Sequence, residues 1–154
     1  MPSDIDLSRL HAVFQVAMGW TNSHLHQFVV GPNYFGVPHT EFDNDTEDEK
    51  RVQLTQIAPN VGDRFVYEYD FGDGWHHNVL VEKVVEPERG QRYPNCLGGK
   101  RACPPEDCGG PWGYTEFVEA IQDPSHKKHD NMLEWLGGSF DPEALSISGI
   151  NSAL

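Results

Sequence analysis

Three cysteines in one stretch rich in glycine and proline are the first residues whose spacing could support chemistry. They stand at Cys96, Cys103 and Cys108 in the segment YPNCLGGKRACPPEDCGGPWGY. Thiolates together with an imidazole form tetrahedral zinc sites, and His77, on a predicted strand leading toward this stretch, is the expected fourth ligand. A zinc ion there would be structural and would hold a long irregular segment in place. The spacing lacks the C-x2-C pairs of zinc ribbons, so reduced thiols packed among glycines are the alternative.

Imidazoles, carboxylates and indoles from distant parts of the chain form a second candidate site, a binding pocket. Its members are Trp20, His24, His26, Asp70, Asp73, Trp75 and His77. Such carboxylates and imidazoles could bind a divalent metal or serve as general acid and base. His24 and His26 alternate along a predicted strand, so their side chains share one face. In the structural alternative, the two aspartates cap backbone amides of a turn and neighbouring groups satisfy the histidines.

Two strands joined by a tight turn are predicted to position most of this second site. The β-rich runs at residues 64–69 and 75–85 flank residues 70–74, whose two glycines suit a hairpin loop. A further strand is predicted at residues 24–30, where Gly31-Pro32 ends it. The histidines and aspartates would then meet at one end of a sheet.

Periodic apolar residues predict helices at both ends of the chain. A stripe from Asp6 to Met18 has Asp6 as its N-cap and Gly19 as its stop. Two further stripes cover residues 114–121 and 132–136, and Asp141-Pro142 is predicted to start a last helix. Residues 31–51 and 86–113 are predicted to be loops, and residues 52–57 suit either a strand or a helix.

The composition is that of one folded, acidic domain covering residues 1–154. The chain has 11 Lys and Arg against 24 Asp and Glu, a formal net charge of −13. This charge argues against unaided binding to nucleic acid or to an anionic membrane, because both interactions depend on cationic side chains. No apolar run is long enough to span a bilayer and the first residues lack a signal pattern, so a cytoplasmic protein is expected.

Three long blocks of the sequence resemble the plasmid pRiA-type ORF-3-like family. They are LHAVFQVAMGWTNSHLHQF, FVYEYDFGDGWHHNVLVEKV and the cysteine segment, and the closing FDPEALSISGIN is similar as well. The resemblance implies an α+β domain of prokaryotes, encoded on plasmids or beside mobile elements and sometimes transposon-associated, with no established activity. The family pattern carries over onto Trp20, His24, His26, Asp70, Gly72, Asp73, Trp75, His77, Cys96, Cys103, Pro104, Pro105, Glu106, Asp107, Cys108 and Gly113.

One departure from the family pattern concerns the start of the chain. Family members usually carry an extended segment before the first helix, whereas this sequence begins just before that helix. Either the true start lies upstream, or the sheet lacks a strand. In the second case its exposed edge must be covered, and a second copy in a homodimer could cover it.

Together these patterns predict a single α+β domain with an antiparallel sheet of about four strands, packed helices and a Gly/Pro/Cys-rich loop. The leading functional hypothesis is a non-enzymatic binding or interaction module of plasmid or mobile-element context, with a protein or small-molecule partner and a zinc ion as the candidate cofactor. A metal-dependent hydrolase using the His/Asp cluster is the first alternative. A transposon-associated accessory protein related to DNA is the second, and the net charge opposes direct DNA contact.

Overall fold

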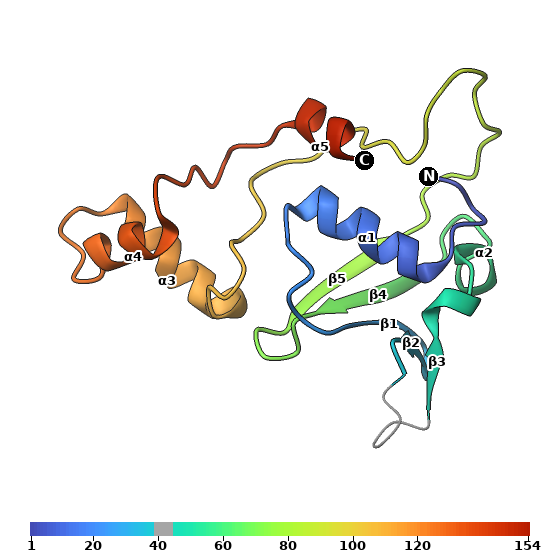
Figure 1. The fold of residues 1–154 in the computed structure, drawn as a ribbon, viewed down its shortest axis with the longest axis horizontal. Helices are drawn as coiled ribbons and strands as arrows, with labels where there is room; N and C mark the ends of the chain where they lie inside the picture. Colours follow the sequence, from blue (N-terminus) through green and yellow to red (C-terminus); the bar gives the residue numbers. More distant parts are fainter. Residues whose placement is uncertain (39–44) are drawn as a thin grey trace.

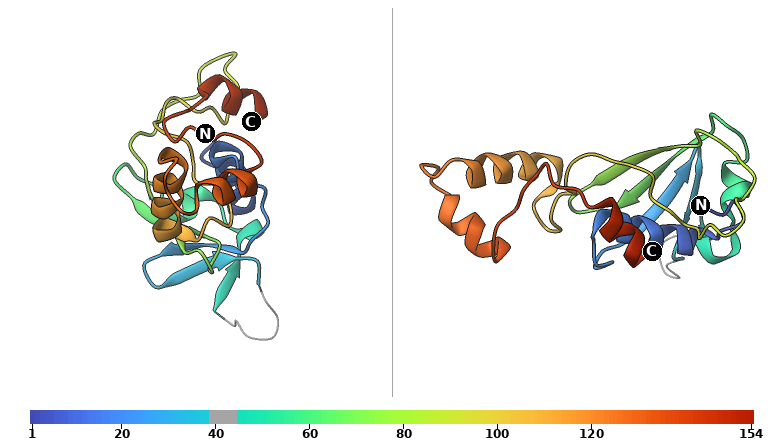
Figure 2. Two further views of the ribbon diagram at one scale, coloured as in Figure 1. Left: turned by 90° about the vertical axis from the view of Figure 1, so that its left-hand side faces the viewer. Right: turned by 90° about the horizontal axis from the view of Figure 1, so that it is seen from above.

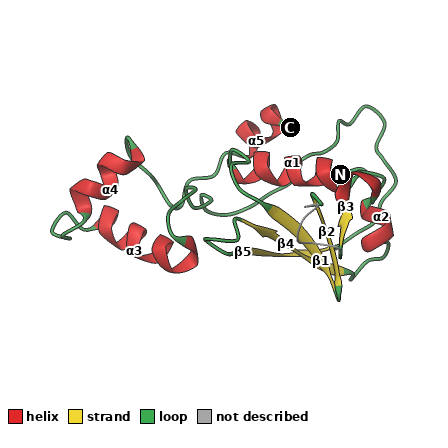
Figure 3. Cartoon of the chain, turned by 60° about the horizontal axis from the view of Figure 1, so that its bottom comes forward, coloured by secondary structure: helices red, strands yellow, loops and turns green. Residues whose placement is uncertain are grey.

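A five-stranded sheet with helix α1 (Leu7–Met18) on one face forms the body of the protein. The computed structural model describes residues 1–38 and 45–154. Figures 1 and 3 show α1 lying along the sheet. The strands are β1 (His26–Val30), β2 (Asn33–Gly36), β3 (Thr46–Asp48), β4 (Arg64–Tyr69) and β5 (Trp75–Leu80). The other elements are η1 (Glu49–Arg51), α2 (Leu54–Ile57), α3 (Gly110–Gln122), α4 (His129–Leu136) and α5 (Ile147–Ala153).

The first helix forms as its sequence predicts. The Asp6 side chain accepts a hydrogen bond from the backbone amide of Arg9, which satisfies a free N–H of the first turn. Gly19 ends the helix in the left-handed conformation, at φ 75°, where a residue without Cβ is favoured. Leu7 and Leu10 are fully buried against the sheet. The short segment that follows α1 leads directly into β1, so His24 lies just before the start of that strand.

The predicted hairpin is also present and supplies the centre of the core. Strands β4 and β5 pair antiparallel with Tyr67 opposite His77 and Tyr69 opposite Trp75. Phe65, Tyr67 and Tyr69 alternate along β4 and all three are buried beneath α1. The predicted second strand, 75–85, ends earlier than expected, at Leu80.

Residues 31–51 contain more regular structure than their sequence suggests. They were predicted to be a loop, but β2, β3 and η1 lie in this region, and the strand order is β3-β2-β1-β4-β5. The β2–β3 pair is parallel, whereas the other pairs are antiparallel, so the sheet is mixed and has five strands. Part of the acidic run, residues 41–44, lies outside the described residues. Pairing with neighbouring strands here overrides weak local propensity.

The last helix begins later than predicted. Ser146, not Asp141, provides the N-cap, and its hydroxyl accepts a hydrogen bond from the amide of Gly149. Asp141 instead caps a turn through the amide of Glu143. Residues 52–57, for which the sequence left two possibilities, contain the short helix α2. None of the described helices combines the length and the apolar character needed to cross a membrane.

Helices α3 and α4 form an arm that extends away from the sheet (Figures 1 and 2). Hereafter "the arm" means residues 110–136. Phe117 is buried within it and contacts the rings of Tyr114 and Trp135, and Phe140, just after the arm, packs on the same side chain. The arm thus has a small core of its own. Residues 86–109, which lead into the arm, contain no helix or strand, as predicted, whereas residues 110–113 of the predicted loop form the first turn of α3.

Candidate functional site

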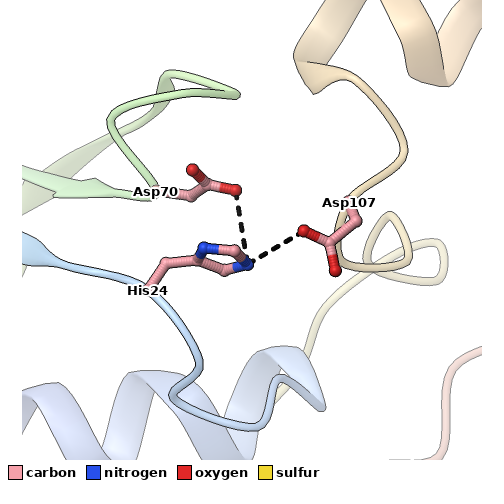
Figure 4. Close-up of side chains that lie close together, drawn as sticks. All are labelled: His24, Asp70 and Asp107. Carbon is pink, nitrogen blue, oxygen red and sulfur yellow. Dashed lines mark ion pairs between the residues drawn. The ribbon is translucent and has the colours of Figure 1, made fainter.

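Three segments that are far apart in the sequence meet at one end of the sheet. His24 lies between α1 and β1, Asp70 directly follows β4, and Asp107 belongs to the loop before α3 (Figure 4). His24 Nε2 lies 3.0 Å from Asp107 Oδ1 and 3.6 Å from Asp70 Oδ2. Within the described residues, this is the one place where three His, Cys, Asp or Glu ligand atoms all lie within 4.8 Å of one another.

The His24 ring nitrogen is buried and lacks a well-formed hydrogen bond. Among the residues that the structure describes, His24 Nε2 is the one buried side-chain nitrogen or oxygen that has no hydrogen-bond partner. Its two carboxylate neighbours are within ion-pair distance but not in hydrogen-bonding geometry. A buried polar atom left in this state costs about 1–3 kcal/mol, so such an atom calls for a ligand or a proton to compensate it.

The spacing of the three ligand atoms fits a divalent cation. Metal–ligand distances of roughly 2.0–2.2 Å place neighbouring ligand atoms about 3.0 Å apart in octahedral and about 3.4 Å apart in tetrahedral geometry. The two distances from His24 Nε2, 3.0 and 3.6 Å, lie around these values, and the oxygens of the two carboxylates lie within 4.8 Å of each other. One imidazole and two carboxylates form a donor set suited to zinc or manganese, with further positions left for water or a ligand.

The hairpin turn orients Asp70 and leaves one of its oxygens free to bind. Oδ1 accepts hydrogen bonds from the backbone amides of Gly72 and Asp73, at 3.0 and 3.2 Å. Asp70 itself is in the left-handed region, at φ 53°, and its amide donates to the carbonyl of Leu25. These bonds fix the carboxylate so that Oδ2 faces His24. Groups that hold a ligand in this way tune metal sites in general.

Glu106 ties the loop that carries Asp107 to the body of the protein. Its Oε2 accepts hydrogen bonds from the amide and the hydroxyl of Thr21, and its Oε1 accepts from the Tyr69 hydroxyl. Burial alone would raise the pKa of Glu106, but the bonds from Thr21 and Tyr69 hold it below the usual value. Burial and the bond to this carboxylate raise the pKa of Tyr69 to about 12. Glu106 is therefore a carboxylate that attaches the loop to the body, and both of its oxygens already accept hydrogen bonds.

Asp73 fastens the start of α3. Its Oδ2 accepts a hydrogen bond from the amide of Gly109 at 3.1 Å. Gly110 follows at φ 67°, and a Cβ at this position would lie 2.1 Å from the carbonyl oxygen of Asp73. The chain can approach the hairpin this closely because residue 110 has no side chain. Asp73 thus positions the loop and is not a member of the His24, Asp70 and Asp107 group.

His26, predicted to share a site with His24, instead belongs to a separate buried network. Its ring stacks on that of His11, with centroids 3.4 Å apart, and its Nε2 donates to Glu49 at 2.7 Å. His11 Nε2 donates to the side-chain oxygen of Asn22, and the Tyr67 hydroxyl donates to His11 Nδ1. Both ring nitrogens of His11, the Tyr67 hydroxyl and His26 Nε2 have hydrogen-bond partners, so the network is a structural part of the core.

The aromatic members of the predicted pocket pack against one another beneath the loop. Trp20 stacks on Tyr69, contacts Trp75 and meets the edge of His77. Its indole N–H donates to the carbonyl of Pro104, so the ring anchors the loop to the body. Burial lowers the pKa of His77, whose Nδ1 lies 3.2 Å from the carbonyl of Tyr67.

The structure does not gather the predicted zinc ligands into one group. Cys96 is tied to α5 by two hydrogen bonds between its backbone and the side chain of Asn151, and Cys103 packs on the main core. Burial, with a smaller contribution from Cys108, raises the pKa of Cys103 to about 12, and burial raises that of Cys108 to about 11. None of these thiols, nor His77, belongs to a three-ligand group in the described part of the chain. Zinc at these cysteines stays a prediction that metal analysis would decide.

Asp107 was not predicted to be a member of the site. Asp107 and Glu106 lie in the cysteine loop and match the family pattern, but nothing in a local pattern tells which loop residue reaches His24. The signal that was available is the PPED sequence itself, two adjacent acids in a segment that must be held by something. His11 and Glu49 were missed because each looks like an ordinary surface residue of its element.

These features define a class: a single α+β domain whose mixed sheet ends in a His/Asp cluster beneath a projecting helical arm. The chain matches the model of the family described as plasmid pRiA4b ORF-3-like protein over residues 1–149, and it belongs to that family. It is 46% identical over 156 residues to the uncharacterized protein y4hQ of Sinorhizobium fredii, with 100% of this chain and 80% of that protein covered. A crystal structure of a protein of unknown function, MM3350 from Methanosarcina mazei Go1, is similar with a TM-score of 0.86 and 34% identity. That match covers 96% of this chain and 84% of the other.

Proposed function

We propose that this protein is a divalent-cation-binding module, and that His24, Asp70 and Asp107 are the ligands. The observation that carries the proposal is the buried, unpartnered Nε2 of His24 facing two carboxylates at ligand spacing. Two carboxylates and one neutral imidazole bring two negative charges, which a divalent cation neutralises. Zinc and manganese are the cations whose ligand preferences fit best.

A binding role without catalysis has support from the surroundings of the cluster. A cavity of about 380 Å³ lies elsewhere, between α1 and the end of the chain, where Arg9, Val13 and Leu154 line it. The cluster is instead covered on one side by the loop that Glu106 and Trp20 attach to the body through hydrogen bonds. A cation bound there would therefore link segments of the protein, and the loop would leave little room for a bulky substrate.

A metal-dependent hydrolase is the second candidate, and one observation favours it. Asp107 is 68% exposed, so the outer side of the cluster faces solvent. Three protein ligands leave coordination positions for a water, as in catalytic zinc sites. Hydrolysis of phosphoester or amide model substrates with zinc or manganese added, lost in the His24→Ala variant, would establish this function.

The binding proposal is tested by calorimetric titration of metal-free protein with zinc and with manganese. One equivalent of a cation should bind, and His24→Ala and Asp107→Asn should each weaken binding at least about tenfold, or about 1.4 kcal/mol. His76→Ala and Asp130→Asn are matched controls, because both residues are exposed and lie outside the cluster. If wild type binds neither cation, or if the controls lose as much affinity as the cluster variants, the proposal is wrong.

A further inference from the structure

The arm has its own core and is joined to the body through the site. Phe117 and Ala120 are buried within the arm, and neither belongs to the main core under α1. Helix α3 packs mainly against α4. In the described part of the chain, neither helix packs comparably against a strand of the sheet. Figure 2, seen from above, shows the arm leaving the body at the end of the hairpin. Two segments join the arm to the body, the short loop at residues 104–109 and the segment 137–146 that leads to α5, and the first of them carries the site.

Carboxylates make most of the attachments of that loop. Glu106 binds Thr21 and Tyr69, Asp73 binds the amide of Gly109, and Asp107 faces His24 and Asp70. Trp20 adds one neutral bond, to Pro104. Two of the four carboxylates, Asp70 and Asp73, belong to the hairpin, and the other two belong to the loop. The junction thus places negative charges on both of its sides.

Among the described residues, no ion pair joins a Lys or Arg to any of these four carboxylates. The pairs Arg9–Asp6, Arg51–Asp48, Arg101–Glu143 and Lys128–Glu116 all lie away from the junction. Like charges at short range repel, and the repulsion is stronger where water is excluded. Asp107 also holds a left-handed backbone conformation, at φ 60°, which is unfavourable for a residue with a side chain. Without a counter-ion, both effects favour release of the loop from the hairpin.

We infer that the cation bound by His24, Asp70 and Asp107 is a clamp that fixes the arm on the sheet. This inference rests on the proposed function, since it assigns a consequence to the same cation. Asp107 is the ligand that comes from the arm side, and His24 and Asp70 come from the body. With the cation bound, Asp70 and Asp107 no longer face each other as uncompensated like charges, because both carboxylates are attracted to the same cation. The arm, with Trp112 exposed (89%) in its first turn, is then presented in one orientation.

Hydrogen–deuterium exchange with and without a saturating cation tests the clamp. Amides at residues 106–113 should exchange at least about threefold more slowly with zinc or manganese bound, while amides inside β1 and β4 stay unchanged. The effect should vanish in Asp107→Asn, whose exposed side chain can change without disturbing the core. It should persist in the control Asp130→Asn.

The outcomes separate the clamp from the binding proposal. If titration shows one bound cation but exchange at residues 106–113 does not change, the clamp is wrong and the binding proposal stands. If exchange slows equally in all strands and helices, the cation stabilises the whole fold and the clamp is again wrong. If titration shows no binding, both proposals fail together.

Discussion

Two clusters that each combine imidazole and carboxylate groups lie close together in this protein, and their imidazole nitrogens differ in hydrogen bonding. The network of His11, His26, Glu49 and Tyr67 is buried, and the polar atoms of its hydrogen bonds are paired. The cluster of His24, Asp70 and Asp107 has an imidazole nitrogen with no hydrogen-bond partner among the described residues. Residue type alone therefore does not identify a binding site. A buried polar atom that lacks a partner and faces charges of one sign is the better indication.

Removing Glu49 should have the largest effect, because it breaks the satisfied network. Glu49→Ala leaves the buried His26 ring nitrogen without its partner, which should lower the free energy of unfolding by about 3 kcal/mol. Urea unfolding followed by circular dichroism measures this loss. The loss of His24 provides the contrast: His24→Ala should change unfolding by less than about 1 kcal/mol in metal-free protein. Equal losses in the two variants would contradict the distinction between the clusters.

Adding the cation should stabilise the wild type by the next largest amount. At a free concentration of 100 times the dissociation constant, binding to the folded state alone adds about 2.7 kcal/mol. Thermal unfolding with zinc or manganese should show this as a raised midpoint. Asp107→Asn should lose most of the shift, whereas Glu49→Ala, although less stable, should keep it. A shift of the same size in both variants would mean that the cation binds elsewhere.

Gly110→Ala should disturb the junction between the arm and the body. The new Cβ would lie 2.1 Å from the Asp73 carbonyl, and the residue would be held at φ 67°, so a loss of about 2 kcal/mol is expected. Gly138→Ala is the matched control, because nothing lies within 4 Å of its added Cβ and its φ is not positive. The two free energies of unfolding, measured side by side, test this. If Gly138→Ala is as costly as Gly110→Ala, close approach at the junction is not the reason.

The smallest expected effect is a dependence of stability on pH through His11. Burial, and then the neighbouring His26, lower the pKa of His11 below its ordinary value of 6.5. As the pH falls below 6.5, the unfolded chain takes up a proton that folded His11 does not, so the free energy of unfolding falls. The fall is at most about 1.4 kcal/mol per pH unit and stops at the pKa of the folded state. Unfolding at pH 7.5 and pH 5.5 should show a smaller difference in His11→Gln. The same slope in both proteins would argue against His11.

Elements that depend on local signals were well predicted. Asp6 and Gly19 set the ends of α1, and the glycines of the hairpin loop join two strands with alternating apolar residues. Elements that depend on distant partners were not. β2 and β3 form because each pairs with another strand, and Ser146 became the N-cap of α5 although Asp141-Pro142 looked better placed. Local preference decides where nothing else competes, and tertiary contacts decide elsewhere.

The candidate site shows the same division. His24 and Asp70 could be selected from the sequence because imidazoles and carboxylates are the groups that bind metals or serve as general acid and base, but Asp73, selected with them, attaches the loop. The separation of His24 from His26, only two residues away, could not be predicted. It depends on Glu49, which reaches His26, and on Asp107, which reaches His24.

By itself, the sequence determined the acidic character of this protein, its family, its α+β class and the hairpin that holds Asp70. Those properties follow from composition and from short-range patterns of side chains and turns. Only the tertiary structure decided which histidine is buried in a complete network and which one faces two carboxylates. The physical reason is that hydrogen bonding and charge neutralisation are settled between residues up to 85 positions apart, as Thr21 and Glu106 are.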